Sequence, residues 1–518
     1  MVTPLCYYSR TMKENIIVID GSSLSIEQVV DVVFKDSVVS ISDQAVSSME
    51  ASREIINTIL DRGTTVYGVN TGFGRLCRIP VERDELEQLQ LNLVRSHASG
   101  VGLPLPEAVV RSMLLLRANA LAKGFSGIRP EVVHRLVDMI NCRVHPIIPQ
   151  MGSVGASGDL APLAHMTLVL IGEGEALVDG ERLPGAEALR KAGLKPVALQ
   201  AKEGLSLVNG TQMMAAVAAL ALAAGEKIVD LSNLVGAMSL DASRDSVAPM
   251  DARIHACRPH PGQEECAGAI RRYLEGSEIN RSHIDCQKIQ DSYSFRCMPQ
   301  VHGAVRDVLR FARRVITIEV NSATDNPLIF PESEDVLSGG NFHGEPVAFW
   351  LDFLAIALSE LGSISERRID KILDPVFNDG LPPFLAENSG FQSGYMISQY
   401  TAAALVSENK VLTHPAVVDT IPTSAGKEDH VSMGGVGATK LLKVLENVGF
   451  ILSIEVLCAV QALDYRAPLK SGEPIERFKR EVRQRLPHLT DDRPVHRDIE
   501  TVRKFLVEKN YLLPVWSE

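Results

Sequence analysis

One stretch of the chain is suited to covalent chemistry. Residues 152–159 read Gly-Ser-Val-Gly-Ala-Ser-Gly-Asp, so small residues surround Ser157. The amide nitrogen of Gly158 can attack the carbonyl carbon of Ala156 and close a five-membered ring, because small residues and a glycine without Cβ permit the compressed backbone that this attack needs. Loss of two water molecules, one of them from the Ser157 side chain, leaves a methylidene group conjugated to the ring. The stretch therefore predicts an electrophile that no ordinary side chain supplies.

Three other interpretations of this stretch compete with cyclisation. A phosphate-binding loop would need Gly-x-Gly-x-x-Gly or a terminal Gly-Lys-Ser/Thr, and residues 152–159 contain neither. A serine-nucleophile elbow needs Gly-x-Ser-x-Gly, whereas the order that contains Ser157 is Gly-Ala-Ser-Gly. A plain flexible loop is the remaining alternative.

Six further islands of sequence, in the same order, resemble the family of histidine and aromatic amino acid ammonia-lyases. They are Tyr67–Gly74, Ser96–Ala98, Leu207–Thr211, Gln290–Arg296, Gly340–His343 and Glu428–His430. The resemblance runs from about residue 16 to about the last 50 residues. It implies a mainly α fold, in which an N-terminal loop-rich region carries the loop at 152–159 beside a long central helical bundle. It also implies a homotetramer whose active sites each draw on several subunits.

The same resemblance implies a cofactor and a set of site residues. The cofactor would be 4-methylidene-imidazol-5-one (MIO), formed autocatalytically from Ala156-Ser157-Gly158, with no metal or external cofactor. Such an electrophile makes a substrate amine a better leaving group, and a base must then remove a proton from the substrate Cβ. Tyr67 is the expected base, because a phenol near a cationic or electrophilic centre ionises more readily.

Arg296 is expected to hold the substrate carboxylate in a bidentate pair. The resemblance places Asn209 at the MIO group or the substrate amine, Gln290 and Tyr293 along the pocket, and Phe342 beside the electrophile. Ordinary structural roles stay open as alternatives: loop packing for Tyr67, a surface ion pair for Arg296 and core packing for Phe342. A non-catalytic helical assembly protein of the same fold is an alternative of another class, and it predicts an uncyclised loop.

Two places bear on the choice of substrate. Ser96-His97 resembles the Ser-His pair of the histidine lyases, where tyrosine lyases tend to show His-Leu and phenylalanine lyases Phe-Leu. Glu428 resembles a carboxylate that accepts the imidazole N–H, and a phenyl ring there would leave that charge buried and unpaired. Both details favour elimination of ammonia from L-histidine to give trans-urocanate, with a tyrosine or phenylalanine lyase or an aminomutase as the alternative. Gly426-Lys427 stands where the histidine lyases usually carry Asn-Gln, so it counts against this assignment.

Helices must position most of these residues. After Pro346, apolar residues recur at helical spacing from Val347 to Ile364, with Asp352 and Glu360 on other faces. Further helices are expected at about 396–412, at 475–486 and from residue 499, and a short strand at 16–20. Ser22 or Ser23 could cap the helix that follows this strand. Because no polar linker interrupts the chain, we expect a flexible extension at 1–14, an MIO-containing region at 15–205 and a helical bundle with C-terminal helices at 206–518.

Composition restricts the possible partners. The chain has 52 basic and 64 acidic residues, and its net charge of −12 argues against binding to nucleic acid or to an anionic membrane surface. The longest apolar run, Met213–Ala224, is shorter than the roughly 20 residues that span a bilayer, and Met1–Glu14 lacks the apolar segment of a secretory signal. Eight cysteines without regular spacing predict reduced thiols and a cytoplasmic protein. One further set, His255, Cys257, His260 and Cys266, is spaced too loosely for structural zinc, so we expect no metal.

Overall fold

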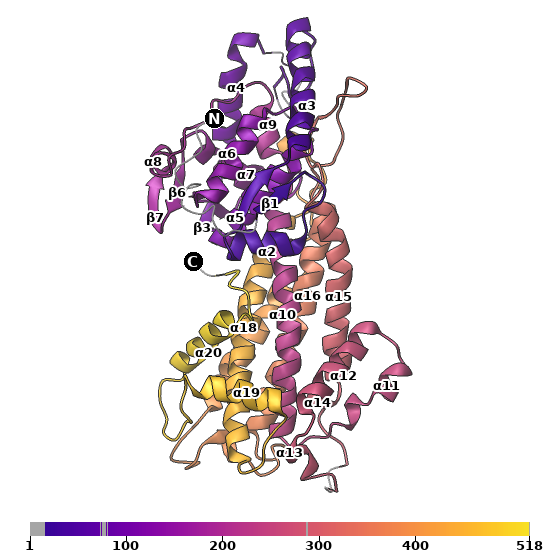
Figure 1. Cartoon of the computed structure of the whole chain (residues 1–518), viewed down its shortest axis with the longest axis vertical. Coiled ribbons are helices and arrows are strands. Elements are labelled where there is room, and N and C mark those ends of the chain that lie inside the picture. The colour runs from indigo at the N-terminus through magenta and orange to yellow at the C-terminus, as the bar shows by residue number, and fades with distance from the viewer. Residues whose placement is uncertain (1–15, 73, 75–78, 80, 286–288, 517–518) are drawn as a thin grey trace.

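Four long helices form the centre of the molecule (Figure 1). They are α10 (Gln212–Ala242), α15 (Met298–Glu319), α16 (Glu345–Leu373) and α18 (Gly434–Tyr465). α10 contains the apolar run and is buried on nearly every face, as expected for a helix that is apolar all round. The computed structural model describes residues 16–72, 74, 79, 81–285 and 289–516, and the expected extension at 1–14 lies outside them. Within this range the predicted mainly α fold with a long central bundle is confirmed.

The helical stripe predicted after Pro346 lies on α16. All of its apolar members are buried, and α16 packs most extensively against α18. Asp352 is off the stripe but is also buried, where it accepts the backbone N–H groups of Ala416 and Val417 and pairs with Lys440 at 3.1 Å. Among the described residues, only α16 is long and apolar enough to cross a membrane, and 61% of its most apolar window is buried inside the molecule.

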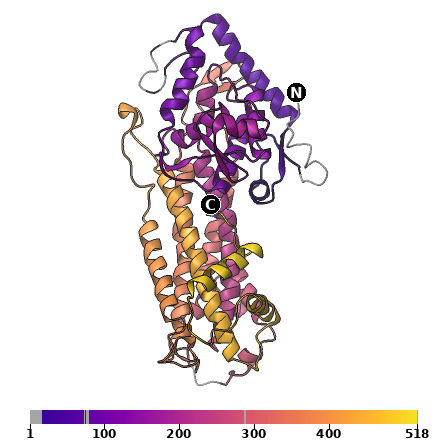
Figure 2. The ribbon, with the colours of Figure 1, turned by 90° about the vertical axis from the view of Figure 1, so that its left-hand side faces the viewer.

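The N-terminal part of the chain forms a loop-rich region at one end of the bundle (Figures 1 and 2). The predicted strand is β1 (Ile16–Ile19), which pairs in parallel with β2 (Val38–Ile41). The helices of this region are α2 (Ile26–Phe34), α3 (Asp43–Arg62), α4 (Leu86–His97), α5 (Glu107–Ala122), α6 (Pro130–Asn141), α7 (Leu160–Leu170), α8 (Gly185–Lys191) and α9 (Glu203–Val208). Two small antiparallel sheets join β3 (Val101–Pro104) to β5 (Pro149–Met151), and β4 (His145–Pro146) to β6 (Glu175–Val178) and β7 (Glu181–Pro184).

The first helix begins later than expected. The N-cap of α2 is Ser25, whose hydroxyl accepts the N–H of Gln28 while the Gln28 side chain accepts the N–H of Ser25. The expectation that Ser22 or Ser23 caps this helix is wrong. Both of these serines instead donate their backbone N–H groups to the carboxylate of Asp20, which closes the turn after β1.

Later parts of the chain return twice to the N-terminal region. The hairpin of β8 (Leu328–Phe330) and β9 (Asp335–Leu337) leads to Gly344, whose N–H donates to the carbonyl of Gly155. The segment before α18 donates the N–H of Met433 to the carbonyl of Val154. Residues from more than one part of the chain therefore surround the loop at 152–159. The proposed division at residues 205 and 206 stays a prediction.

Shorter helices cover the other end and the sides of the bundle. They are α11 (Ala252–Ala256), α12 (Pro261–Leu274), α13 (Glu278–Arg281), α14 (Tyr293–Arg296), α17 (Met396–Leu412), α19 (Glu473–Arg483) and α20 (His496–Glu508). The helices predicted near 396–412, 475–486 and 499 are confirmed as α17, α19 and α20. Each predicted C-terminal helix rests on buried apolar residues, such as Ile475 and Phe478 of α19.

The described cysteines include both free thiols and a disulfide-bonded residue. Cys257, Cys266, Cys297 and Cys458 are free thiols. Cys142 is disulfide-bonded, so the expectation of reduced thiols throughout is wrong, and a cytoplasmic location stays a prediction. In the described part of the chain no group of three or more His, Cys, Asp or Glu residues could hold a metal ion. His255, one of the four residues with metal-like spacing, instead contacts the side chain of Gln263 and the carbonyl of Pro249.

Candidate active site

The loop predicted to cyclise lies between β5 and α7 and contacts the segment before α10. Gly158 has φ of +72°, and the N–H of Asp159 donates to the carbonyl of Gly210 at 2.7 Å. A Cβ at Gly158 would lie 2.1 Å from the Gly210 carbonyl oxygen, so only glycine fits here. The loop backbone at Gly158 therefore lies directly against that of Gly210.

Asp159 fastens this loop to the first turn of α10. One of its oxygens accepts the N–H groups of Met213 and Met214 at 2.9 and 3.0 Å, and the other accepts the Ser153 hydroxyl at 2.8 Å. Complete burial raises the pKa of Asp159 to about 6, although these hydrogen bonds act in the opposite direction. The carboxyl group lies at a helix N-terminus, where a negative charge is favoured.

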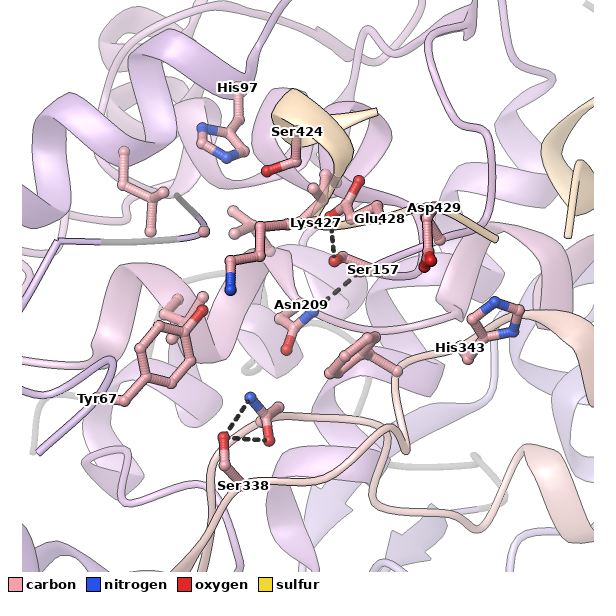
Figure 3. A pocket seen from close by; sticks show the side chains of 18 of the residues that line it. Tyr67, His97, Ser157, Asn209, Ser338, His343, Ser424, Lys427, Glu428 and Asp429 are labelled. Carbon is pink, nitrogen blue, oxygen red and sulfur yellow. Dashed lines mark hydrogen bonds between the residues drawn. The ribbon is translucent and has the colours of Figure 1, made fainter. Parts of the chain in front are cut away.

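Two side chains hold Ser157 from opposite parts of the chain. Asn209, at the end of α9, donates its Nδ2 to the Ser157 carbonyl at 2.9 Å. The Ser157 hydroxyl donates to Oε1 of Glu428 at 2.5 Å, and Thr423 donates to Oε2 of the same carboxylate at 2.6 Å. Figure 3 shows Glu428 reaching Ser157 from above and Asn209 from below. The hydroxyl that cyclisation must remove is thus hydrogen-bonded to a carboxylate.

A cavity of about 880 Å³ opens over this loop (Figure 3). The predicted site residues that line it are Tyr67, His97, Ala156, Ser157, Asn209, Phe342 and Glu428. Gly158, the third residue of the expected ring, is not among the lining residues. Residues separated by more than 350 positions thus meet at one cavity, as the sequence islands led us to expect.

His97 ends α4 at the rim of this cavity. Burial lowers the pKa of His97, and the charge of Glu428 opposes that shift. The Nδ1 atom of His97 lies 3.1 Å from the hydroxyl of Ser96. Near neutral pH His97 is therefore a neutral imidazole, able to donate one hydrogen bond and accept another.

Three predicted site residues lie elsewhere in the chain. Tyr293 and Arg296 belong to α14, at the opposite end of the bundle from the loop (Figure 1), and Arg296 donates to the Gln290 side chain at 2.8 Å. Tyr293 is 73% exposed, with the Arg296 guanidinium 5.5 Å from its ring centre. Within one chain the structure does not bring Gln290, Tyr293 and Arg296 to the cavity.

The cavity also contains ionisable residues that were not predicted to belong to the site. Lys427, Asp429, His343 and His430 all line it. The rings of His343 and His430 are stacked with their centres 5.8 Å apart. Asp429, His343 and His430 belong to the islands that carry the resemblance. Their position next to Phe342 or Glu428 in the sequence could therefore have identified them as candidate site residues.

Comparison of the sequence with known protein families agrees with this arrangement of loop and cavity. The sequence profile described as "Aromatic amino acid lyase" matches residues 24–484. The chain belongs to the aromatic amino acid lyase family. Among its relatives in this family, it is 50% identical to a histidine ammonia-lyase of Myxococcus xanthus over 96% of this chain and 97% of that one. It is 53% identical to a histidine ammonia-lyase of Anaeromyxobacter dehalogenans over 95% and 98%.

Solved structures of the aromatic amino acid lyase family share the fold. Histidine ammonia-lyase from Trypanosoma cruzi matches with a TM-score of 0.88 and 43% identity, over 96% of each chain. Tyrosine aminomutase from Streptomyces globisporus matches with a TM-score of 0.91 and 37% identity, over 96% of this chain and 98% of that one. The fold is thus common to a lyase and an aminomutase, and the substrate must be argued from the site.

Proposed function

We propose that this member of the family is a histidine ammonia-lyase, which eliminates ammonia from L-histidine to give trans-urocanate. The observation that carries the proposal is the Glu428 carboxylate, held 2.5 Å from the Ser157 hydroxyl in the cavity. A carboxylate at the reacting loop can accept the N–H of an imidazole, whereas a phenyl side chain has no donor and would leave it poorly paired. The names of the relatives at about 50% identity support the same substrate.

The residues around the loop fit an MIO group. The space beside Gly158 admits no Cβ, Ala156 is buried, and Asn209 donates to the Ser157 carbonyl, so the segment is enclosed and held in place. The group would supply an electrophilic carbon that makes the substrate amine a better leaving group. Ala156, Ser157 and Gly158 would form it and Asn209 and Asp159 would hold it in place. We propose no metal or external cofactor.

The other residues of the cavity have separate tasks. Tyr67, on the opposite side of the cavity from Asp429 and His343 in Figure 3, would accept the proton from the substrate Cβ at its hydroxyl oxygen. Glu428 and the neutral His97 would orient the imidazole through hydrogen bonds. Phe342 would exclude water from the reacting carbon.

The substrate assignment is tested by comparing substrates and by changing Glu428. The protein should convert histidine faster than tyrosine or phenylalanine, measured as ultraviolet absorbance of each unsaturated acid. Glu428→Gln should lower histidine turnover about a hundredfold or more, because it removes the charge from a hydrogen-bonded pair. The mass deficit of two water molecules should persist, since an amide oxygen still accepts the Ser157 hydroxyl.

Thr423→Val is the matched control for this change. It removes the hydroxyl that donates to Glu428 but keeps the carboxylate, so turnover should fall far less. Faster conversion of tyrosine than of histidine would contradict the assignment. Equal loss of turnover and of the mass deficit in Glu428→Gln would mean that Glu428 is structural.

We also propose that the protein assembles as a homotetramer in which several subunits complete each active site. Two observations support this. Arg296, the expected carboxylate ligand, lies at the far end of its own bundle (Figure 1). Large apolar side chains are exposed along the bundle helices, namely Phe311 and Ile318 of α15, Phe349, Phe353 and Ile356 of α16, and Ile397, Tyr400 and Val411 of α17. Exposed apolar surface of this extent marks protein–protein contact.

Complementation between inactive variants tests the shared site. Ser157→Ala and Arg296→Ala should each be inactive alone, but mixed tetramers produced by co-expression should regain activity, because some sites then combine an intact loop with an intact arginine. The measurement is histidine turnover of the co-expressed pair together with the mass of the assembly in solution. No recovery in a mixed tetramer would place Arg296 outside the site.

A further inference from the structure

Lys427 occupies a tight turn that presents it to the cavity. Thr423 and Glu428 close this turn, with the Thr423 N–H donating to the Glu428 carbonyl at 2.9 Å and the Glu428 N–H donating back at 3.3 Å. Ser424 and Ala425 have φ of 51° and 52°, a left-handed conformation that costs free energy for residues with a Cβ. The strained turn places Lys427 and Glu428 next to each other at the cavity wall.

Adjacent opposite charges do not pair here. The two oxygens of Glu428 accept the hydroxyls of Ser157 and Thr423. Among the residues that the structure describes, the Lys427 ammonium group has neither an ion-pair partner nor a hydrogen bond. Figure 3 shows the Lys427 side chain extended across the cavity, with its ammonium group and the Tyr67 hydroxyl pointing toward one another. The lysine therefore faces the expected base and not the neighbouring carboxylate.

We propose that Lys427 is a positioning residue whose ammonium group stabilises the ionised form of the Tyr67 hydroxyl and so makes the base available at lower pH. The proposal rests on the role of Tyr67 in the proposed function. A nearby cation favours the phenolate over the neutral phenol by direct Coulomb attraction. Lys427 is exposed within one chain, so solvent weakens this attraction. We therefore expect the Lys427 charge to lower the pKa of Tyr67 by less than a buried cation would.

None of the other described ionisable groups of the cavity offers Tyr67 a positive charge in the same way. Glu428 is a carboxylate and would disfavour a phenolate, and burial lowers the pKa of His97, which favours its neutral form. Asp429 and His343 lie on the far side of Ser157 from Tyr67 in Figure 3, and His430 stacks on His343. Lys427 is therefore the cation that faces the Tyr67 hydroxyl among the described residues lining the cavity.

Lys427→Gln and Lys427→Arg test the proposal. Glutamine removes the charge and arginine keeps it. In Lys427→Gln, Tyr67 should ionise about one pH unit higher than in the wild type, because the phenolate loses its cation. In Lys427→Arg the midpoint should stay close to that of the wild type. Lys410→Gln removes a lysine from the exposed end of α17 and controls for the change in net charge.

The first readout does not depend on turnover. The tyrosinate absorbance of each protein is titrated against pH and compared with that of the same protein carrying Tyr67→Phe, so that the difference isolates Tyr67 among the 9 tyrosines. An unchanged midpoint in Lys427→Gln overturns the proposal, even if the enzyme is an active histidine ammonia-lyase. A shifted midpoint in a protein that converts none of the three amino acids supports the contact while contradicting the proposed function.

The second readout is the pH profile of kcat/KM for histidine. The acidic limb should move to higher pH in Lys427→Gln by the same amount as the tyrosinate midpoint, and it should not move in Lys427→Arg or Lys410→Gln. A rise in KM with an unmoved acidic limb would instead show that Lys427 binds substrate, and this result also overturns the proposal.

Discussion

Replacing Ser157 by alanine should lower histidine turnover by about a thousandfold or more, the scale on which loss of a covalent catalytic group acts. Alanine has no hydroxyl to lose, so the methylidene group cannot form. The wild-type chain should weigh two water molecules less than its sequence, and Ser157→Ala should lack that deficit. Intact-mass measurement of both proteins, followed by the histidine assay, checks this expectation.

Ser424→Ala separates loss of the electrophile from a general disturbance of the cavity. Ser424 also lines the cavity but lies outside the loop, so this variant should keep the deficit of two water molecules. Thermal unfolding of Ser157→Ala should stay near that of the wild type, because the hydrogen bond from Asn209 to the carbonyl of residue 157 needs no side chain at that position. A wild-type chain of full sequence mass would remove the lyase proposal and favour a non-catalytic protein with the family fold.

Replacing Tyr67 by phenylalanine should lower kcat by about a hundredfold to ten-thousandfold, the range that general acid–base catalysis contributes. The ring remains to fill its place in the cavity, but no oxygen is left to accept the proton from the substrate Cβ. KM and the mass deficit should change little, since Tyr67 lies outside the loop. Steady-state kinetics with histidine and the intact mass of the variant provide the measurements.

A deuterium label on the substrate Cβ makes this second test sharper. If Tyr67 removes that proton, Tyr67→Phe should make proton removal more rate-limiting and increase the isotope effect on kcat. A variant that loses the mass deficit together with its activity would show instead that Tyr67 serves loop formation. Retained turnover in Tyr67→Phe would transfer the role of base to another cavity residue.

Periodic patterns predicted the helices well because burial of one face determines them. The apolar spacing after Pro346 located α16, and Pro415 marked the region where α17 ends. Burial of Asp352 could not be read from the same pattern, because its partners, the N–H groups of Ala416 and Val417, lie more than 60 residues away. The cap of α2 was misplaced for a more local reason, since Asp20 competes for the N–H groups of Ser22 and Ser23.

The candidate site was predictable in its residue types but not in its geometry. Small residues around Ser157 indicated ring closure, and the structure adds the close packing of Gly158 against Gly210, which only glycine permits. Sequence islands carry no distances, so they could not separate Arg296, which is remote within one chain, from Asn209, which touches the loop. The direction of the Lys427 side chain depends on the left-handed turn at 424–426, which the sequence does not signal.

The residues that contact the loop at 152–159 are synthesised much later than the loop itself. Gly155 is held by Gly344 and Ser432, and Ser157 by Glu428, so the last of these partners follows the loop by more than 270 residues. During translation, Ala156-Ser157-Gly158 are added to the chain long before the residues that enclose them in the folded protein. Under the proposed function, ring closure would have to follow formation of the tertiary structure, and the two missing water molecules would then mark each copy that has folded.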